Sequence, residues 1–556
     1  MPSRSTGRRT PCVPSAPSWR YWAGALLLLS SLVQAQGVDP RVTGYRVTLT
    51  LPSSGDTITA SARVALVRTP NDQTLVLDLV GLAVDGVHWA RDTGSAMPEP
   101  DAWAPASFAY DGRVLRVSLP SVRGAVESDV VEVRYHGAPR DGLLIGVDVH
   151  GRRAVFADNW PERARYWLPS ADRPAAKATV AFDVRAPAGW RVVANGAPQP
   201  AGTGGAAWLE SRPVPPYTMV IGAARFTVSQ HRPAVLGRDT VPVEVWAYPE
   251  DSEFADSGPF RQATEIVEVL ERLVGPFPYE KLAHVESATR FGGMENASAI
   301  FYDEGAWSER RMTEAVVRHE TAHQWFGDAV TERDWHDLWL SEGFATYFDL
   351  VVGAALHGDS LLATGLRADA DRYFRSPVVG RPIVDTAEHD PLRLLNANNY
   401  EKGAWVLAML RATVGDSAFW SGIRAYYRAF RDSTAVSRDL QTVMERAAGR
   451  PLGWFFDQWL DQPGYPKLRC RWQATRDSTS SRASLVLEEV QPASWGVFRL
   501  PDLSLDFVGP GGVRARRRMP VLSPDVRASF DLPFVPTALE LDPDHELLLT
   551  SESNGP

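Results

Sequence analysis

The chain has 556 residues, of which 44% are hydrophobic, and its formal net charge is −9. This length and composition predict a globular protein with three to four domains. The acidic balance disfavours nucleic acid as a partner. The only dense basic run, Arg514–Arg518, is expected to lie on a solvated strand and to carry no function.

Residues 1–35 have the pattern of a signal peptide. Four arginines, the last of them Arg20, precede the apolar run 23–33, and the small residues needed for cleavage end at Ala35. The apolar run is well short of the roughly 20 residues that span a bilayer, so a membrane anchor is the less favoured alternative. We therefore expect an exported protein, periplasmic or extracellular, with no membrane span after cleavage. Loss of the four arginines would change the net charge from −9 to −13.

Three regions of different periodicity follow. Residues 38–248 alternate apolar and polar residues in short runs separated by Gly, Pro and Asp, which predicts an antiparallel β-sheet domain. Residues 249–465 mostly follow a helical spacing, which predicts a mainly helical domain. Residues 466–556 return to a period of two, as expected for a small C-terminal β-sandwich. The predicted fold class is multidomain α+β.

A metal-binding pattern begins at His319. His319 and His323 are four residues apart, so in a helix they share a face and can bind one metal ion, with Glu320 beside it. Thr313 is placed to cap this helix, and Gly327 suits its left-handed end. The alternative is a pair of core histidines whose hydrogen bonds are satisfied within the protein.

Glu342 provides a third candidate ligand. It directly follows Ser341, which we expect to cap a second helix with an apolar face running to Ala355. Two histidines and one glutamate form the ligand set of a catalytic zinc site, in which water takes the fourth position. We therefore predict one Zn²⁺ per chain. Asp337 is a candidate hydrogen-bond partner for a zinc-bound histidine, although a helix-capping or surface role fits equally well.

Motifs around this pattern resemble those of the gluzincin zinc aminopeptidases typified by membrane alanyl aminopeptidase (aminopeptidase N). The family's exopeptidase motif is matched by residues 292–296, its glutamate-ligand motif by 339–343 and its catalytic-tyrosine motif by 400–403. Ser341 replaces the asparagine that is usual in the family. The resemblance implies a thermolysin-like catalytic domain and covers nearly all of the chain after residue 35.

The metal and its neighbours suggest a hydrolytic mechanism. Zinc in such a site lowers the pKa of its bound water to about 7, which provides a nucleophile at neutral pH. Glu320 lies beside the metal without binding it, so it can act as general base and then as general acid. The resemblance implies that Tyr400 stabilises the negative charge that develops on the carbonyl oxygen.

The resemblance also implies an exopeptidase. Glu295 is expected to bind the free α-amine of the substrate and to exclude longer chains on that side. Gly292, Gly293 and Met294 are expected to contact the extended peptide through their backbone, as a strand adds to a sheet. The expected substrates are therefore peptides with a free N-terminus.

Two departures from the family leave specificity open. Trp160 stands where the family typically has a glutamine of the first specificity pocket, and the long helical array of larger members is not found after the β-sandwich, so a more open cleft is expected. Three alternatives remain: a zinc endopeptidase, an epoxide hydrolase of the same clan, and a catalytically silent secreted peptide-binding protein. The sequence does not decide the preferred first residue, the physiological substrate or the oligomeric state.

Overall fold

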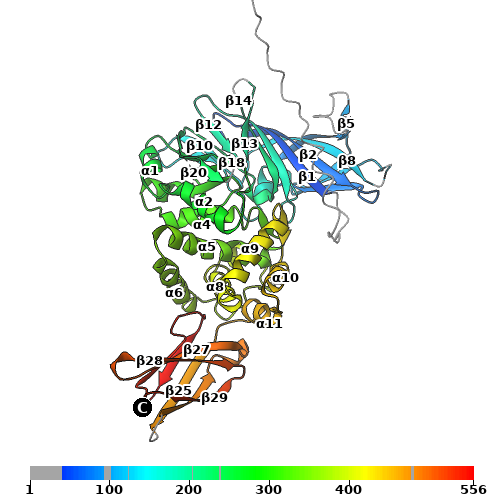
Figure 1. Ribbon diagram of the computed structural model, residues 1–556. Helices are drawn as coiled ribbons and strands as arrows, with labels where there is room; N and C mark the ends of the chain where they lie inside the picture. The colour runs from blue at the N-terminus through cyan, green and yellow to red at the C-terminus, as the bar shows by residue number, and fades with distance from the viewer. Residues whose placement is uncertain are drawn as a thin grey trace, which may run out of the picture.

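The computed structural model describes residues 41–555 except 93–101, 123, 125, 203–204, 237–238 and 477–480. The predicted signal peptide lies outside the described residues. A β-rich region, a mainly helical region and a small β region follow one another along the chain and in space (Figure 1). None of the helices in the described ranges is long and apolar enough to cross a membrane.

The N-terminal region is built on an eight-stranded sheet in the order β13-β14-β11-β1-β2-β8-β4-β5. Apolar side chains alternate with polar ones along its strands, so one face is buried; β2, for example, alternates strictly between buried and more exposed positions. Neighbouring strands are antiparallel except β1 and β11, which are parallel. The strands are β1 (Arg41–Thr50), β2 (Ile58–Arg68), β4 (Ala83–Arg91), β5 (Ala104–Pro105), β8 (Glu127–Gly137), β11 (Ala178–Arg185), β13 (Ala197–Gln199) and β14 (Gly205–Val214).

Two smaller sheets complete this region. One has the order β3-β7-β6 and the other β12-β15-β10-β9. Their strands are β3 (Thr74–Asp78), β6 (Phe108–Tyr110), β7 (Val114–Ser118), β9 (Leu143–Val147), β10 (Arg153–Ala157), β12 (Arg191–Ala194) and β15 (Ile221–Ala224). The prediction of a largely antiparallel N-terminal β domain is therefore confirmed.

A five-stranded sheet joins this region to the helices. Its order is β16-β19-β20-β22-β21, and β19 pairs in parallel with β20. The predicted boundary at residue 248 falls inside this sheet, since β19, which lies before the boundary, pairs with β20, which lies beyond it, and β16 joins the sheet through β19. Chain periodicity changes at the first helix and cannot show which later strand an earlier one pairs with. The strands are β16 (Thr227–Gln230), β19 (Val243–Ala247), β20 (Leu282–Ser287), β21 (Gly293–Met294) and β22 (Ala299–Asp303), with the separate hairpin β17 (Ala234–Leu236) and β18 (Asp239–Val241).

The helical region begins after β19. Helices α4 and α5 pack against each other, and α5 also contacts α8 and the π-helical turn η7. The helices are α1 (Ser252–Ser257), α2 (Ala263–Leu273), α3 (Glu304–Ser308), α4 (Glu314–His323), α5 (Trp339–His357), α6 (Ser360–Phe374), α7 (Pro391–Leu394), η7 (Asn398–Lys402), α8 (Gly403–Val414), α9 (Asp416–Phe430), α10 (Ser437–Ala448), α11 (Gly453–Phe456) and η8 (Asp457–Asp461). The short strands β23 (Val330–Glu332) and β24 (Ser433–Ala435) pair in parallel between them.

The C-terminal region begins with β25, close to the predicted boundary at residue 466. A four-stranded sheet, β29-β26-β25-β31, and a three-stranded sheet, β28-β27-β30, face each other, and the rings of Phe507 and Phe530 meet between them at 5.6 Å. Arg514–Arg518 lies at the start of β28, where Arg514, Arg516 and Arg518 pair with acids, as expected for a solvated strand. The strands are β25 (Lys467–Arg476), β26 (Ser481–Glu489), β27 (Leu500–Val508), β28 (Arg514–Val521), β29 (Asp525–Leu532), β30 (Ala538–Leu541) and β31 (Thr550–Asn554).

Two glycines allow α5 to approach the start of α8. A Cβ atom built on Gly343 would lie 2.9 Å from the Cα of Gly403 and 3.0 Å from the carbonyl oxygen of Asn399. Both of these are backbone atoms, so they cannot move aside as a flexible side chain would. Glu342 directly precedes Gly343, so this contact fixes the position of Glu342 relative to η7 and α8.

We expect Gly343→Ala to lower the free energy of unfolding by about 1–3 kcal/mol, because the added methyl overpacks a backbone contact. The higher helix propensity of alanine, worth about 1 kcal/mol, would offset only part of this. Urea unfolding followed by circular dichroism measures the change. Gly146→Ala is the control, since a Cβ there meets nothing within 4 Å, and equal stabilities of the two variants would contradict the prediction.

Candidate metal centre and cleft

The three predicted metal ligands come from the ends of two packed helices. His319 and His323 lie in the last turns of α4, and Glu342 lies in the first turn of α5. Thr313 occupies the N-cap position of α4, but its side chain makes no capping hydrogen bond. The prediction that Ser341 caps the second helix is wrong, because α5 already begins at Trp339 and Ser341 lies inside it.

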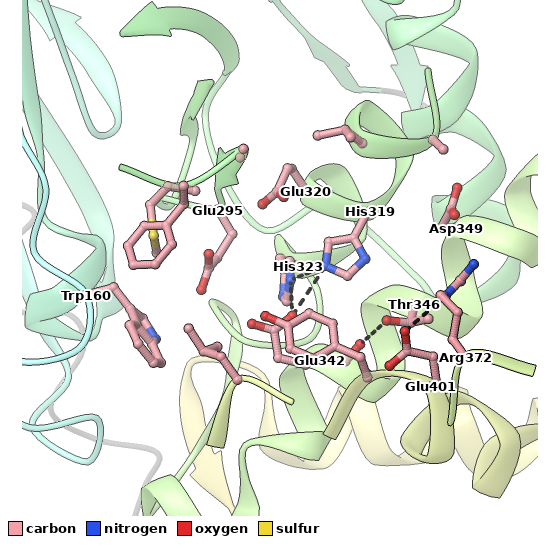
Figure 2. Close-up of a pocket in the computed structure, with 18 residues that line it drawn as sticks. Trp160, Glu295, His319, Glu320, His323, Glu342, Thr346, Asp349, Arg372 and Glu401 are labelled. Carbon is pink, nitrogen blue, oxygen red and sulfur yellow. Dashed lines mark hydrogen bonds and ion pairs between the residues drawn. The ribbon is translucent and has the colours of Figure 1, made fainter. Parts of the chain in front are cut away.

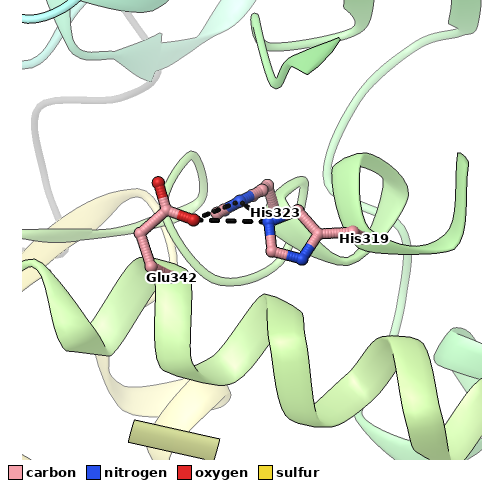
Figure 3. Close-up of side chains that lie close together, drawn as sticks. All are labelled: His319, His323 and Glu342. Carbon is pink, nitrogen blue, oxygen red and sulfur yellow. Dashed lines mark hydrogen bonds and ion pairs between the residues drawn. The ribbon is translucent and has the colours of Figure 1, made fainter. Parts of the chain in front are cut away.

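The three side chains converge on one point (Figure 3). The Nε2 atoms of His319 and His323 are 3.1 Å apart, and each lies 3.3 Å from Oε2 of Glu342. Ligands bound to a tetrahedral zinc at about 2.0–2.1 Å lie about 3.3 Å from one another. The three atoms therefore have the spacing of three corners of a zinc coordination sphere, and the fourth corner is left for water or substrate.

The charges around the ligands also fit a cation. Glu295, Glu320 and Glu342 are all at most 7% exposed and surround His323. Burial and the neighbouring carboxylates raise the pKa of Glu320 well above its usual value, and burial raises that of Glu295 to about 7. Burial also acts on Glu342, but the two histidines hold its pKa below the ordinary value. A divalent cation would balance this concentration of buried negative charge.

His323 is oriented by residues other than the one predicted. Its Nδ1 lies 3.1 Å from the carbonyl oxygen of Phe326 and 3.0 Å from the hydroxyl of Ser341, which leaves Nε2 for the metal. Asp337 instead accepts hydrogen bonds from the backbone and hydroxyl of Ser437. The prediction that Asp337 orients a ligand is therefore wrong for His323. Gly327 (φ +121°) is needed beside this contact, since a Cβ there would lie 2.4 Å from the Ser341 hydroxyl.

Glu320 lies against the predicted peptide-binding strand. A Cβ built on Gly293 would lie 2.3 Å from Oε1 of Glu320, so only glycine allows the carboxylate this close to the backbone. Gly293 and Met294 form β21, which is the edge strand of the five-stranded sheet and pairs with β22. The other edge of β21 can therefore pair with an extended peptide beside Glu320.

Glu295 continues from this strand toward the histidines. Its backbone carbonyl accepts a hydrogen bond from the side chain of Gln324 at 2.8 Å, and the same side chain accepts one from the backbone of Ser298 at 2.7 Å. Gln324 directly follows the last residue of α4, so it ties the glutamate loop to the histidine helix. Sequence reasoning missed Gln324; its position next to His323 was the available signal.

Tyr400 lies in the π-helical turn η7 before α8. Its ring is nearly parallel to that of His319, with the centroids 6.1 Å apart. Burial and the nearby Glu342 raise the pKa of Tyr400 above its ordinary value, so its hydroxyl stays protonated and can donate a hydrogen bond. π-Helical turns frequently occur at functional sites, where they change the direction of one side chain.

All of the site residues predicted from the sequence, except Asp337, line one cavity of about 440 Å³. Figure 2 shows Trp160 and Glu295 on one side of the histidines and Arg372 and Glu401 on the other. Sequence reasoning missed the second group, which comes from α6 and η7 and is brought to the cleft by helix packing. The lining residues are Trp160, Phe291, Gly292, Gly293, Met294, Glu295, Ala315, Val316, His319, Glu320, His323, Glu342, Thr346, Asp349, Arg372, Leu395, Tyr400 and Glu401.

Comparison with known proteins agrees with this geometry. Residues 260–459 match the model of the peptidase family M1 domain. This match supports the predicted resemblance to the gluzincins typified by aminopeptidase N. Aminopeptidase N from Streptomyces lividans is 29% identical over 59% of this chain and 40% of its own. Tricorn protease-interacting factor F2 from Thermoplasma acidophilum is 28% identical over 62% of this chain and 46% of its own.

Solved structures cover more of the fold. An M1 zinc metallopeptidase from Deinococcus radiodurans has 27% identity and a TM-score of 0.63, covering 76% of this chain and 93% of that one. A mutant of it bound to a Tyr-Ser-Ala substrate has 26% identity and a TM-score of 0.63, covering 76% of this chain and 94% of its own. The chain spans about half the length of the curated relatives that it matches. The ligand set of His319, His323 and Glu342 suits zinc, the metal for which these solved M1 metallopeptidases are named.

We expect Ser341→Ala to weaken zinc binding by up to about tenfold, because it removes one of the two groups that orient His323. Asp337→Asn should leave zinc affinity unchanged while lowering the free energy of unfolding by about 1–3 kcal/mol, since it weakens only the contact with Ser437. Competition with a fluorescent zinc chelator measures affinity, and urea unfolding measures stability. If Asp337→Asn were the more damaging to zinc binding, the contacts assigned to His323 would be wrong.

Proposed function

We propose that this protein is a zinc-dependent aminopeptidase that removes N-terminal residues from peptides. The observation that carries the proposal is the position of Glu295, buried and within 4.8 Å of Glu320 and His323, where β21 reaches the metal ligands. A carboxylate in this place binds an α-ammonium group and leaves no room for further residues upstream. The names of the M1 relatives support the proposal. We also propose that residues 1–35 direct export.

Catalysis is assigned to groups around the scissile bond. His319, His323 and Glu342 would hold a zinc ion, which when bound would supply a Lewis acid for the attacking water and the substrate carbonyl. Glu320 takes the proton from the attacking water and then donates it to the nitrogen of the leaving amine, so the C–N bond breaks without release of an anion. Tyr400 donates a hydrogen bond to the carbonyl oxygen as negative charge develops there. Glu295 holds the substrate amine, and the edge of β21 aligns the peptide.

We expect purified protein to hydrolyse free amino-acid amides and to leave their N-acetylated forms uncleaved, because acetylation removes the charge that Glu295 binds. Glu320→Gln should lower kcat by about 10²–10⁴ while zinc remains bound, since the general base is lost. The measurements are amide hydrolysis and zinc content. Equal cleavage of free and acetylated substrates would indicate an endopeptidase, and an active Glu320→Gln variant would overturn the general-base assignment.

The wall beside Glu295 is apolar and aromatic. Trp160 is 3% exposed and makes edge-to-face contacts with Phe291 at 5.9 Å and Trp335 at 5.4 Å. Met294 lines the same side of the cleft. An apolar first side chain can bury its surface against this wall, whereas a charged one would lose its hydration without gaining a partner. We therefore propose a preference for apolar first residues.

We expect Trp160→Ala to lower kcat/KM for leucine amide at least about tenfold more than for alanine amide, because only the larger side chain reaches the indole. Steady-state kinetics on the two amides measures this ratio. Trp454→Ala, in α11 and outside the cleft lining, is the control and should leave the ratio unchanged. A uniform loss with both amides would show that Trp160 supports the fold rather than selects the substrate.

A further inference from the structure

A second group of metal-binding side chains lies outside the cleft. It consists of His150, Asp251 and Glu286, whose candidate ligand atoms all lie within 4.8 Å of one another. His150 is in the turn between β9 and β10, Asp251 directly precedes α1, and Glu286 is on β20. Asp251 lies 101 positions and Glu286 136 positions after His150, and the fold brings them together where the N-terminal sheets meet the five-stranded sheet β16-β19-β20-β22-β21, here called the catalytic sheet. The group shares no residue with the cavity that holds His319.

The hydrogen bonds in this group leave one carboxylate oxygen of Glu286 without a donor. His150 Nε2 lies 2.6 Å from Oδ2 of Asp251, and the backbone N–H of Tyr248 donates to Oε2 of Glu286 at 2.7 Å. Oε1 of Glu286 has no partner within hydrogen-bonding geometry in the described part of the chain, although the residue is completely buried. Burial and the adjacent carboxyl group of Asp251 raise the pKa of Glu286 to about 10, so without a cation the two acids hold a proton between them. A buried carboxylate oxygen without a partner destabilises the fold unless a cation or a proton reaches it.

The surrounding charges do not supply that cation. Arg152 lies over the ring of Tyr248, but it pairs with Asp148 at 3.2 Å and with Glu250 at 2.7 Å. Glu304 adds another carboxylate nearby, which accepts a hydrogen bond from the hydroxyl of Tyr248 at 2.7 Å. The acids around Glu286 therefore outnumber the described basic groups that face them.

We propose that His150, Asp251 and Glu286 bind a second divalent metal ion of the zinc class. One imidazole and two carboxylates match the ligands that zinc and its first-row neighbours accept, and are poorer for calcium, which takes oxygen ligands alone. Glu286 is completely buried and the side chain of Asp251 is 12% exposed, whereas the side chain of His150 is 25% exposed and leaves a path for the ion and for a completing water. The ion links the β9–β10 turn to β20.

The first test uses zinc alone and counts bound ions. After dialysis against buffered Zn²⁺, metal analysis should give two ions per chain in the unaltered protein and one in Glu286→Gln. The double variant His323→Ala, Glu342→Gln, which lacks the cleft ligands, should retain one ion. Glu250→Gln changes a neighbouring exposed acid and should keep two. Two ions in Glu286→Gln, or none in the double variant, would overturn the proposal.

The second test guards against a variant that fails to fold. In the double variant, zinc should raise the thermal unfolding midpoint, because a ligand that binds only the folded state stabilises it. Adding His150→Ala, which alters a partly exposed side chain, should abolish that rise without lowering the midpoint measured in chelator. A rise that persists would assign the bound ion to other residues. Neither outcome depends on peptide hydrolysis, so the aminopeptidase proposal is tested separately.

Discussion

The concentration of negative charge in a buried cleft is the constraint on which the catalytic region depends. Glu295, Glu320 and Glu342 surround His323 at low exposure, and three unbalanced carboxylates so placed would repel one another strongly. A divalent cation held at the spacing of the two histidines and Glu342 balances this charge.

Close backbone contacts place these charges accurately. Gly293 lets the Glu320 carboxylate approach the edge strand, and Gly343 lets α5 reach Gly403 beside the turn that carries Tyr400. In both places a Cβ atom would separate groups whose chemistry requires contact. The metal ligands, Glu320 and Tyr400 therefore come from two helices and one π-helical turn packed beside one edge strand, and this packing is independent of substrate.

The β-rich and helical regions share one sheet at their junction rather than being joined by a linker. Strands β16 and β19 complete the catalytic sheet, and the Lys177 ammonium donates hydrogen bonds to the carbonyl oxygens of Asp328 and Ala329 beyond α4. The His150 group lies at the same junction. Movement of the N-terminal region would therefore disturb the sheet whose edge strand lines the cleft.

The sequence alone was enough to predict a set of metal ligands and the kind of chemistry that they support. His319 and His323 are related by helical spacing, and the motifs around Glu295, Glu342 and Tyr400 are local, so no knowledge of distant contacts was needed. The alternation of apolar residues also predicted the β-rich, helical and β-rich order of the chain. Local patterns carry this information because period and residue type are properties of neighbouring residues.

Contacts between residues far apart in the chain could be identified only from the three-dimensional fold. It gave His323 its partners in Phe326 and Ser341 and removed Asp337 from that role. It moved the start of the catalytic sheet to before residue 248, because strand pairing is a long-range choice that periodicity does not encode. It also placed His150 close to Glu286, which lies 136 positions later in the chain, because the two regions that carry them pack together.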